Sequence, residues 1–359
     1  MKRKRIVVAM SGGVDSSVAA ALLQSEGHEV IGVTLRLKPP EPTSAIKDPV
    51  VDAQVVADHL GIPLCILDRA ERFRDMVLRP SWEEYARGRT PNPCVLCNPS
   101  IKFDALLEVA RAEGAEWVAT GHYARVSHEP GTAPVLLRAK DRAKDQSYFL
   151  FALTPPHLAR VIFPLGDLTK VEVRGIARER GLPSADRVES QDACVVGMGE
   201  RLPDYLCTLF GEQGRPGAIV ATDGSSLGTH DGFHRLTIGQ RRGIGVAVGV
   251  PAWVKAIDPV TGTVTMVTEP DDLLASGLHA SGMTWHGPPP GIGSFPCMAQ
   301  VRYGHHPIRA TVEPGAHGSA AIHFETPVRA VTPGQAVVLY DNDAVLGGGW
   351  IRDAVQVRG

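Results

Sequence analysis

The sequence predicts an α/β fold, in which a doubly wound parallel sheet is followed by two smaller β-rich domains, the last of them barrel-like. Up to about residue 125, short apolar runs alternate with segments of helical periodicity, which is the pattern of βα units around a parallel sheet. After about residue 200, glycine, proline and threonine punctuate short β-rich runs, as they do in small sandwiches and barrels. The expected domains are residues 1–200, 201–275 and 276–359.

The elements of the parallel sheet come first along the chain. Residues 5–10 form a short apolar run suited to a buried parallel strand. The next residues, 15–27, place apolar side chains at helical spacing and end on Gly27, a common helix stop. Ligands of such sheets bind at the carboxyl ends of the strands, so a site is expected at that edge. Further strands are expected at residues 29–37, 62–68 and 116–126, and further helices at residues 51–61, 101–114 and 170–181.

The second half of the chain opens with one more expected helix, residues 202–210. Residues 252–268 are expected to form a β-hairpin, because a Thr-Gly turn lies between two alternating segments. The proline-rich stretch 285–293 is expected to be a loop or linker near the second domain boundary. Other β-rich runs lie at residues 233–238, 298–304, 309–314, 320–324 and 335–341.

The composition is that of an ordinary globular protein. Of 359 residues, 43% are hydrophobic and 21% charged. No run approaches the ~18 apolar residues of a membrane span, and the basic start MKRKRIVVAM lacks the apolar core and cleavage site of a signal peptide. We therefore expect a cytoplasmic protein without a membrane partner. The formal net charge of −2 attracts no nucleic acid globally, so RNA contacts would have to come from local basic patches.

A glycine turn stands between the first expected strand and the first expected helix. Residues 11–16, Ser-Gly-Gly-Val-Asp-Ser, let the backbone approach an anion at a helix N-terminus, and Ser11 and Ser16 add hydroxyl groups. The turn lacks the Gly-Lys-Ser/Thr of a Walker loop and the glycine pattern of a dinucleotide site. The sequence therefore predicts a phosphate cradle of another type.

Asp15 narrows this prediction. A carboxylate beside phosphates is repulsive unless a cation lies between them, so Asp15 points to Mg²⁺ held with a pyrophosphate group. The alternative is an ordinary glycine turn with Asp15 as a helix cap. The string resembles the PP-loop of the ATP pyrophosphatases, a Rossmann-like group, and the resemblance implies cleavage of ATP to AMP and pyrophosphate.

The six cysteines are irregularly spaced, so in a reducing compartment they are expected to be buried, catalytic or metal-bound. Cys94 and Cys97 come just ahead of an expected helix, where a thiol pKa is lowered, and Cys194 follows far along the chain. Sulfur transfer needs two thiols, one to carry a persulfide and another to attack it. The alternatives for Cys94 and Cys97 are half of a zinc site, without a second half, or a redox pair. Cys65, Cys207 and Cys297 lie in apolar surroundings and are expected to be core residues.

Seven stretches, in order and beginning with the one that contains the glycine turn, extend the resemblance to almost the whole chain. They read AMSGGVDSSVAAALL, GRTPNPCVLCNPSIKF, ATGHYAR, KDQSYFLFAL, SQDACVV, TIGQRRGIGVA and VRYGHHP. On these stretches the chain resembles the tRNA-specific 2-thiouridylases of the bacterial MnmA family, whereas synthetases that share only the first loop lack the rest.

The resemblance assigns roles to residues. It implies that Cys97 is the nucleophile, that Cys194 carries the persulfide, and that the two form a transient disulfide. It implies ATP binding by Ala9, Met10, Ser11, Gly12, Gly13, Val14, Asp15, Ser16, Leu35 and Gly121. It implies contacts with tRNA by Asn92, Pro93, Cys94, His122, Lys144, Asp145, Gln146, Arg302, Tyr303 and Gln335.

Two stretches depart from the family pattern. Many members carry aspartate where this chain has Cys94, which favours Cys97 over Cys94 as the nucleophile. Residues 36–49 also lack the motifs that the family usually has there. In the family, this stretch forms the adenine and ribose side of the ATP site.

The basic stretches suit an RNA substrate when taken together. Residues 138–147, 239–243 and 301–309 are rich in cations. Any one of them alone would more often be a solvated face. Tyr303 can stack on a base, whereas Asp145 and Gln146 can either read a base or shape a turn.

The predicted function is ATP-dependent thiolation of uridine 34 of tRNA to 2-thiouridine, through an adenylated base and a cysteine persulfide. The expected cofactors are ATP and Mg²⁺. The expected partners are the anticodon arm of tRNA and a sulfur donor, either a cysteine desulfurase or a sulfur relay protein. Two alternatives remain, an amide-forming synthetase that uses the same loop and a non-catalytic tRNA-binding protein.

Overall fold

The computed structural model describes residues 3–38, 49–187, 196, 200–211, 214–246, 248–287 and 293–357. These residues belong to two compact units. Unit 1 comprises Met1–Val77, Cys94–Gly197 and Asp343–Val345, and unit 2 comprises Leu78–Pro93, Met198–Asn342 and Leu346–Gly359.

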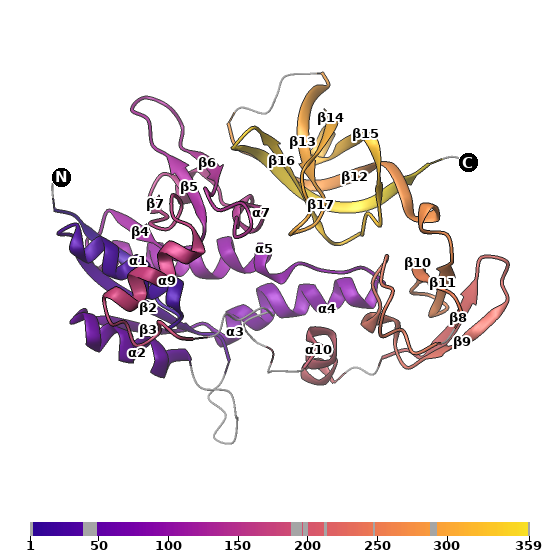
Figure 1. Ribbon diagram of the computed structural model, residues 1–359, viewed down its shortest axis with the longest axis horizontal. Coiled ribbons are helices and arrows are strands. Elements are labelled where there is room, and N and C mark those ends of the chain that lie inside the picture. Colours follow the sequence, from indigo (N-terminus) through magenta and orange to yellow (C-terminus); the bar gives the residue numbers. More distant parts are fainter. Residues whose placement is uncertain are drawn as a thin grey trace. The chain divides into compact units, whose positions relative to one another are not determined.

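Unit 1 is built on a five-stranded parallel sheet with the strand order β3-β2-β1-β4-β7 (Figure 1). The order runs one way from β1 to β3 and the other way from β1 to β4 and β7. Loops that follow β1 and β4 therefore diverge at the carboxyl edge of the sheet, where ligands of such folds bind. The strands are β1 (Arg5–Ala9), β2 (Glu29–Arg36), β3 (Leu64–Asp68), β4 (Trp117–Ala119) and β7 (Val161–Ile162).

Helices cover this sheet because strand and helix share apolar residues. Ile6 and Val8 of β1 pack in one cluster with Ala20 of α1 and with Ala53 and Val56 of α2. Helix α6 contacts β1 and β4, and α9 packs against α1. The helices are α1 (Val14–Ser25), α2 (Pro49–Leu60), α3 (Ala70–Phe73), α5 (Pro93–Cys97), α6 (Asp104–Ala112), α7 (Ser147–Leu150), α8 (Pro155–Leu158) and α9 (Lys170–Glu179). Two π-helical segments, η1 (Arg74–Leu78) and η2 (Asn98–Phe103), continue α3 and α5.

Two expected elements of unit 1 were wrong in extent. The single strand expected at 116–126 is two strands, because the chain leaves the sheet after β4 and forms β5 (Ala124–Ser127), which pairs antiparallel with β6 (Val135–Arg138). The helix expected from residue 101 begins eight residues earlier, at Pro93. Proline is favoured in the first turn of a helix, where its missing N–H costs nothing. Cys94 and Cys97 therefore lie within a helix rather than ahead of it.

The first part of unit 2 is a mixed sheet with the order β10-β11-β8-β9. Its expected hairpin is confirmed, since β10 (Trp253–Asp258) and β11 (Thr263–Val267) pair antiparallel around Gly262 at φ 73°. The run 233–238 was wrongly expected to be a strand, because Phe233–Arg235 forms a 3₁₀ turn. Phe233 and Leu236 are both buried, and this three-residue spacing suits a helical turn. The other elements are α4 (Arg79–Ala86), α10 (Leu202–Phe210), β8 (Gly217–Ala221), β9 (Ser226–His230) and η4 (Pro270–Leu273).

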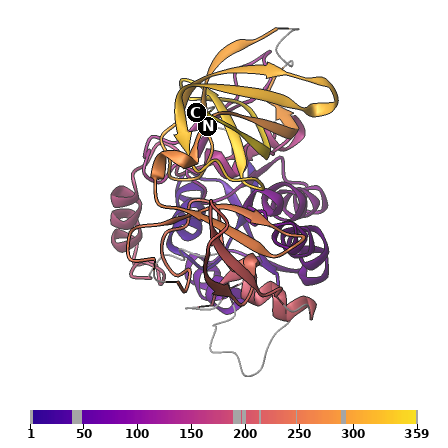
Figure 2. The ribbon, with the colours of Figure 1, turned by 90° about the vertical axis from the view of Figure 1, so that its right-hand side faces the viewer.

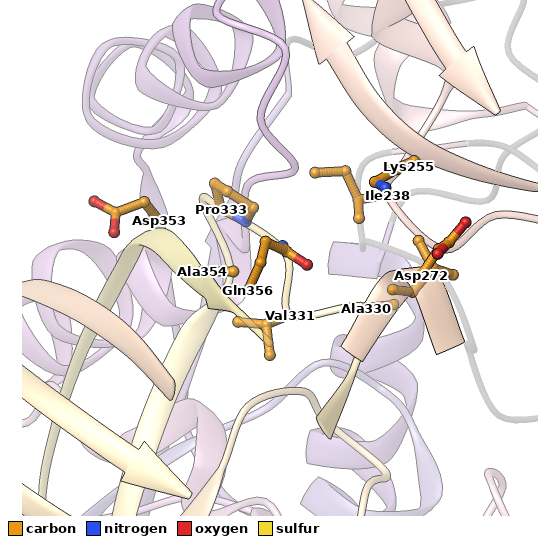
Figure 3. Close-up of a pocket in the computed structure, with 10 residues that line it drawn as sticks. Ile238, Lys255, Asp272, Ala330, Val331, Pro333, Asp353, Ala354 and Gln356 are labelled. Carbon is orange, nitrogen blue, oxygen red and sulfur yellow. The ribbon is translucent and has the colours of Figure 1, made fainter. Parts of the chain in front are cut away.

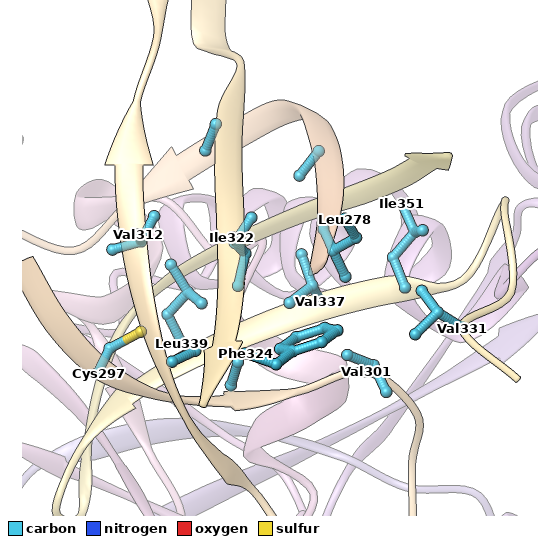
Figure 4. Packing of buried hydrophobic residues seen from close by; sticks show 14 of the residues in the cluster. Leu278, Cys297, Val301, Val312, Ile322, Phe324, Val331, Val337, Leu339 and Ile351 are labelled. Atoms are coloured by element: carbon cyan, nitrogen blue, oxygen red, sulfur yellow. The ribbon is translucent and has the colours of Figure 1, made fainter. Parts of the chain in front are cut away.

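The second part of unit 2 is a closed barrel of six strands in the order β12-β15-β14-β13-β16-β17, closed by antiparallel pairing of β12 with β17 (Figure 2). Leu278, Ile322, Val337, Leu339 and Ile351 meet in its interior (Figure 4). The barrel confirms the expected fold class. The strands are β12 (Leu274–Trp285), β13 (Phe295–Gln300), β14 (Ile308–Pro314), β15 (Ala320–Arg329), β16 (Ala336–Asp341) and β17 (Ala344–Gln356). Of the expected linker 285–293, residues 288–292 lie outside the described residues.

Among the described helices, none has both the length and the apolar character needed to cross a membrane.

The packing of the barrel interior implies that a cavity made there lowers the free energy of unfolding. Leu278 is fully buried, so Leu278→Ala is expected to lower the free energy of unfolding by about 2–5 kcal/mol. Val260, on a turn of the same unit, is 85% exposed, and Val260→Ala is expected to change it by less than about 0.5 kcal/mol. Urea unfolding of both variants measures the difference. Equal stabilities would contradict the packing described here.

Candidate nucleotide and thiol site

The glycine turn lies where the sequence predicted it, between β1 and α1. The Met10 N–H donates to the Val33 carbonyl at 2.7 Å, which carries the ladder one residue beyond the strand. Gly12 then turns at φ 73°, and a Cβ there would lie 2.4 Å from the Cβ of Asp52. Ser16 Oγ donates to the Gly13 carbonyl at 3.1 Å and accepts from the Ser11 N–H at 3.2 Å. The turn is therefore tight and admits only glycine at position 12.

Helix α1 begins without a side-chain cap. Its N-cap residue, Gly13, has no side chain that could accept a hydrogen bond from the N–H groups of the first turn. The N–H groups of the first turn are thus open to a ligand, and they carry the positive end of the helix dipole. This set of donors fits a phosphate group.

Asp15 has two partners in the structure. Its Oδ1 accepts from the Tyr123 hydroxyl at 2.9 Å, and both carboxylate oxygens accept from Lys170 Nζ, at 2.8 and 2.9 Å. Lys170 comes from the first position of α9 and is 9% exposed. The predicted Mg²⁺ ligand is therefore paired with a lysine, and no cluster of three or more metal-ligating side chains occurs among the described residues.

Neither Lys170 nor Tyr123 was predicted from the sequence to belong to the site, although the sequence holds one signal for Lys170. A lysine directly after the Thr169 cap places a cation at the positive end of a helix, which is unfavourable unless a carboxylate lies nearby.

Two further contacts brace the glycine turn. A Cβ on Gly121, which follows β4, would lie 2.7 Å from the carbonyl carbon of Asp15 and from the Ser16 nitrogen. Arg187 donates to the Gly12 carbonyl at 2.9 Å and to Asp52 at 2.6 Å. Cys194, seven positions after Arg187, lies outside the described residues, and so does its predicted disulfide with Cys97.

The two thiols of the Cys-x-x-Cys pair differ in exposure. Cys94 is exposed in the first turn of α5, whereas Cys97 is 4% exposed at the junction of α5 with the π-helical segment η2. π-Helical turns inside α-helices are frequent at functional sites. Asn98, next to Cys97, is buried, and its amide donates to the Phe149 carbonyl at 2.9 Å. Its Oδ1 has no partner among the described residues.

Backbone and side-chain bonds join the loop after β4 to the Lys144–Gln146 segment. The Tyr123 N–H donates to Gln146 Oε1 at 2.9 Å, and the Gln146 N–H donates to the Tyr123 carbonyl at 2.8 Å. Unit 1 thus links Asp15, through Tyr123, to Gln146, and links Phe149 to the helix of Cys97. Four stretches that are far apart in sequence meet in one network.

Asp145 is occupied within its own loop. Its carboxylate accepts from Arg138 Nε at 2.8 Å, from the Ala139 N–H at 3.0 Å, and from the N–H and hydroxyl of Ser147 at 3.2 and 3.0 Å. Asp145 is also 8% exposed. These contacts fit turn chemistry, one of the two roles considered for it, and leave Lys144 and Gln146 partly exposed beside it.

His122 is held as a neutral ring. Its Nδ1 lies 2.6 Å from Thr120 Oγ1, and its ring stacks on Phe103 and meets Phe163 edge-on. Burial, and then the charge of Lys102, hold the pKa of His122 well below 6.5.

The predicted residues of unit 2 form their own group. Gln335 donates to the carbonyls of Thr90 and Pro91, at 3.0 and 3.2 Å, just ahead of the buried Asn92. Arg302 donates to the Ala330 carbonyl at 2.9 Å, and Tyr303 beside it is 40% exposed. Gln335 therefore braces the segment that leads to Pro93.

The remaining residues singled out from the sequence are Leu35 and three cysteines. Leu35 lies in β2 opposite Leu67 of β3. Cys297 is buried, which raises the pKa of its thiol to about 12, so it behaves as a core residue. Cys65 and Cys207 are half-buried.

Unit 2 also holds a cavity of about 130 Å³ lined by Lys255, Asp272, Val331, Asp353 and Gln356, among others (Figure 3). None of the residues that the sequence singled out lines it. It is smaller than the ~300–1,000 Å³ typical of ligand sites, so it carries no functional assignment.

Comparison with known proteins covers the whole chain. Residues 4–198 match the tRNA methyl transferase HUP domain, residues 203–268 the tRNA methyl transferase PRC-barrel domain, and residues 275–351 the aminomethyltransferase beta-barrel domain. The chain is 45% identical over 370 residues to tRNA-specific 2-thiouridylase MnmA of Geotalea uraniireducens, covering 99% of this chain and 97% of that protein. It is 46% identical over 370 residues to the protein of the same name from Geobacter metallireducens, covering 99% of both chains.

Gly121 provides a test of the bracing. Gly121→Ala places a methyl group against backbone atoms of Asp15 and Ser16, which cannot swing away. We expect the free energy of unfolding to fall by about 1–3 kcal/mol and ATP binding to weaken with it. Gly175, inside α9, has nothing within 4 Å of its Cβ position, so Gly175→Ala is expected to be neutral or mildly stabilising. A harmless Gly121→Ala would show that the close contact does not hold the loop.

His122 predicts a stability change with pH. Because its folded pKa is depressed, the unfolded chain binds the proton first as the pH falls below 6.5. The free energy of unfolding is therefore fully present above that pH and falls below it, by up to about 1.4 kcal/mol per pH unit, until the folded pKa is reached. Urea unfolding between about pH 7.5 and 5 is expected to show a smaller loss for His122→Asn than for the wild type. His59→Asn, at an exposed position of α2, is the matched control, and an unchanged His122→Asn profile would contradict the assignment.

Proposed function

The chain belongs to the tRNA-specific 2-thiouridylase MnmA family, and from this membership we propose how its site performs ATP-dependent 2-thiolation of uridine 34 in tRNA. The chain is thus a tRNA-thiolating enzyme, a sulfurtransferase that uses ATP. The observation that carries the proposal is the network in unit 1. It joins the anion-binding turn at Asp15 to Tyr123 and Gln146, and the same segment to the helix of Cys97.

The first step activates the base. The uncapped N–H groups of α1 and the hydroxyls of Ser11 and Ser16 bind the phosphates of ATP. The uridine O2 attacks the α-phosphorus, so an O–P bond forms, the bond to the departing pyrophosphate breaks, and the base is adenylated. Mg²⁺ bound with the nucleotide would neutralise phosphate charge, with Asp15 as its ligand.

The second step delivers sulfur. The terminal sulfur of a Cys194 persulfide attacks C2 of the adenylated base, and AMP leaves with the O2 atom. The Cys97 thiolate attacks the Cys194 sulfur, so the S–S bond of the persulfide breaks and a Cys97–Cys194 disulfide forms. An external thiol then reduces this disulfide, and a sulfur donor protein, a cysteine desulfurase or a relay protein, reloads Cys194.

The burial of Cys97 and the place of Cys194 in the sequence support these roles. Cys97 is shielded from water, which protects an activated base from hydrolysis. Arg187 ties the chain seven positions before Cys194 to the Gly12 carbonyl. Cys194 therefore follows an anchored residue closely in the sequence.

The tRNA contacts are proposed to come from both units. His122, Lys144 and Gln146 of unit 1 lie along the network beside the turn and would meet the flipped base and its neighbours. Asp145 would act through the shape of this loop, because its carboxylate is already satisfied. In unit 2, Asn92 and Pro93, with Cys94 following in unit 1, would contact the target base, and Gln335 holds their segment. Arg302 and Tyr303 would contact the RNA backbone and stack on a base. We further propose a cytoplasmic location, where tRNA is modified.

The test is a reaction with ATP, Mg²⁺, a sulfide or persulfide source and unmodified tRNA that has uridine at the wobble position. Digestion and mass spectrometry are expected to show uridine in which sulfur has replaced oxygen. Cys97→Ala and Cys194→Ala are expected to abolish the product, whereas Cys65→Ala, at a half-buried cysteine of β3 outside the site, is expected to retain it.

The outcomes separate the rival functions. A uridine that gains a methyl group instead would favour the methyl transfer named in the family descriptions. AMP released without sulfur in the RNA would favour another ATP pyrophosphatase, such as an amide-forming synthetase. tRNA binding without any ATP cleavage, unaffected by Asp15→Ala, would favour a non-catalytic protein.

A further inference from the structure

The anion-binding turn carries no cation of its own. Residues 11–16 hold one carboxylate, Asp15, and neither lysine nor arginine. A Walker loop contains a lysine that reaches the phosphates, whereas here the helix N-terminus supplies only about half a positive charge. ATP is strongly anionic, and Asp15 repels it. A cation from another element is needed to balance the site.

Two effects disfavour a charged lysine at the place of Lys170: burial and the positive end of a helix dipole. It is 9% exposed, and it occupies the first position of α9, at the positive end of that helix dipole. The helix does not need it, because Thr169 and Glu172 already form a complete capping box. The Asp15 side chain is 33% exposed, and a partly exposed ion pair adds little stability, so the position of Lys170 indicates a role at the site.

The contacts of Lys170 allow its ammonium group to change partners. Its backbone is fixed, because its N–H donates to Asp141 at 2.9 Å. Its side chain ends on Asp15. Asp15 keeps the Tyr123 hydroxyl as a second donor, at 2.9 Å, when the ammonium leaves. The pair can therefore open without leaving the carboxylate bare.

We propose that Lys170 is the phosphate-binding cation of this nucleotide site. Without nucleotide it neutralises Asp15; with ATP bound, its ammonium group binds a phosphate oxygen and leaves the carboxylate to the Tyr123 hydroxyl and to the metal ion. The inference rests on the proposed function, in which this turn binds ATP. It adds a residue that the sequence motif of the turn does not contain.

The first experiment is equilibrium binding of ATP to the full chain without tRNA, in EDTA so that Mg²⁺ does not enter the comparison. Lys170→Met is expected to weaken binding roughly 10- to 100-fold, the effect of one charge-assisted hydrogen bond. Arg178→Met, which removes a positive charge from the exposed part of the same helix, is expected to bind as the wild type does. Lys170→Arg is expected to retain part of the affinity.

A second comparison separates direct contact from neutralisation of Asp15. If Lys170 contacts phosphate, the Asp15→Asn/Lys170→Met double variant binds ATP more weakly than Asp15→Asn by a similar factor. If the two bind equally, Lys170 acts only through Asp15 and the inference is overturned. Adenosine is the second ligand. Its binding is expected to be the same in wild type and Lys170→Met, whereas an equal loss for adenosine and ATP would show general disruption and overturn the inference.

Failure of the proposed function looks different. A wild-type chain that bound no ATP would overturn that function, and this inference with it. Wild-type binding that persists unchanged in Lys170→Met would overturn the inference alone.

Discussion

The close approach of Gly121 to the first turn of α1 is the constraint on which the site depends. It lies at the carboxyl edge of the parallel sheet, where β1 and β4 are neighbours and the chain after β4 passes over the start of α1. With no side chain between them, the loop after β4 lies directly on the backbone of Asp15 and Ser16. The Tyr123 hydroxyl can then reach Asp15, and the backbone of Tyr123 is left to bind Gln146.

Electrostatic balance is the second theme of unit 1. The turn combines an uncapped helix end and one carboxylate with two cations from other parts of the chain, Lys170 and Arg187. In the loops beyond the turn, charge is neutralised within the loop itself. Arg138 and two backbone N–H groups bind the Asp145 carboxylate, and burial keeps the His122 ring neutral. The positive charge that remains beside the turn is therefore concentrated on few side chains, and local patches rather than the net charge of −2 would attract an anionic substrate.

Much of this could be predicted from local pattern. The parallel sheet, the hairpin at Gly262 and the barrel follow from periodicity and turn residues, and the glycine turn follows from its string. The failures came from tertiary contacts. The local sequence does not show that the chain leaves the sheet after β4, nor that Gly121 then lies against the backbone of residues 15 and 16. Likewise, Lys170 is 155 positions from Asp15. A lysine at the start of a helix suggests a nearby carboxylate, but the sequence does not show which carboxylate it is.

The hydrogen bond from Arg187 to the Gly12 carbonyl bears on the rate of sulfur delivery. It fixes Arg187 at the nucleotide turn, and Cys194 follows seven positions later in the sequence. Groups on tethers of this length experience an effective concentration of about millimolar or more. A sulfur atom loaded on Cys194 would thus meet the activated base in a unimolecular encounter, and the rate of that encounter would not depend on the cellular concentration of the sulfur donor.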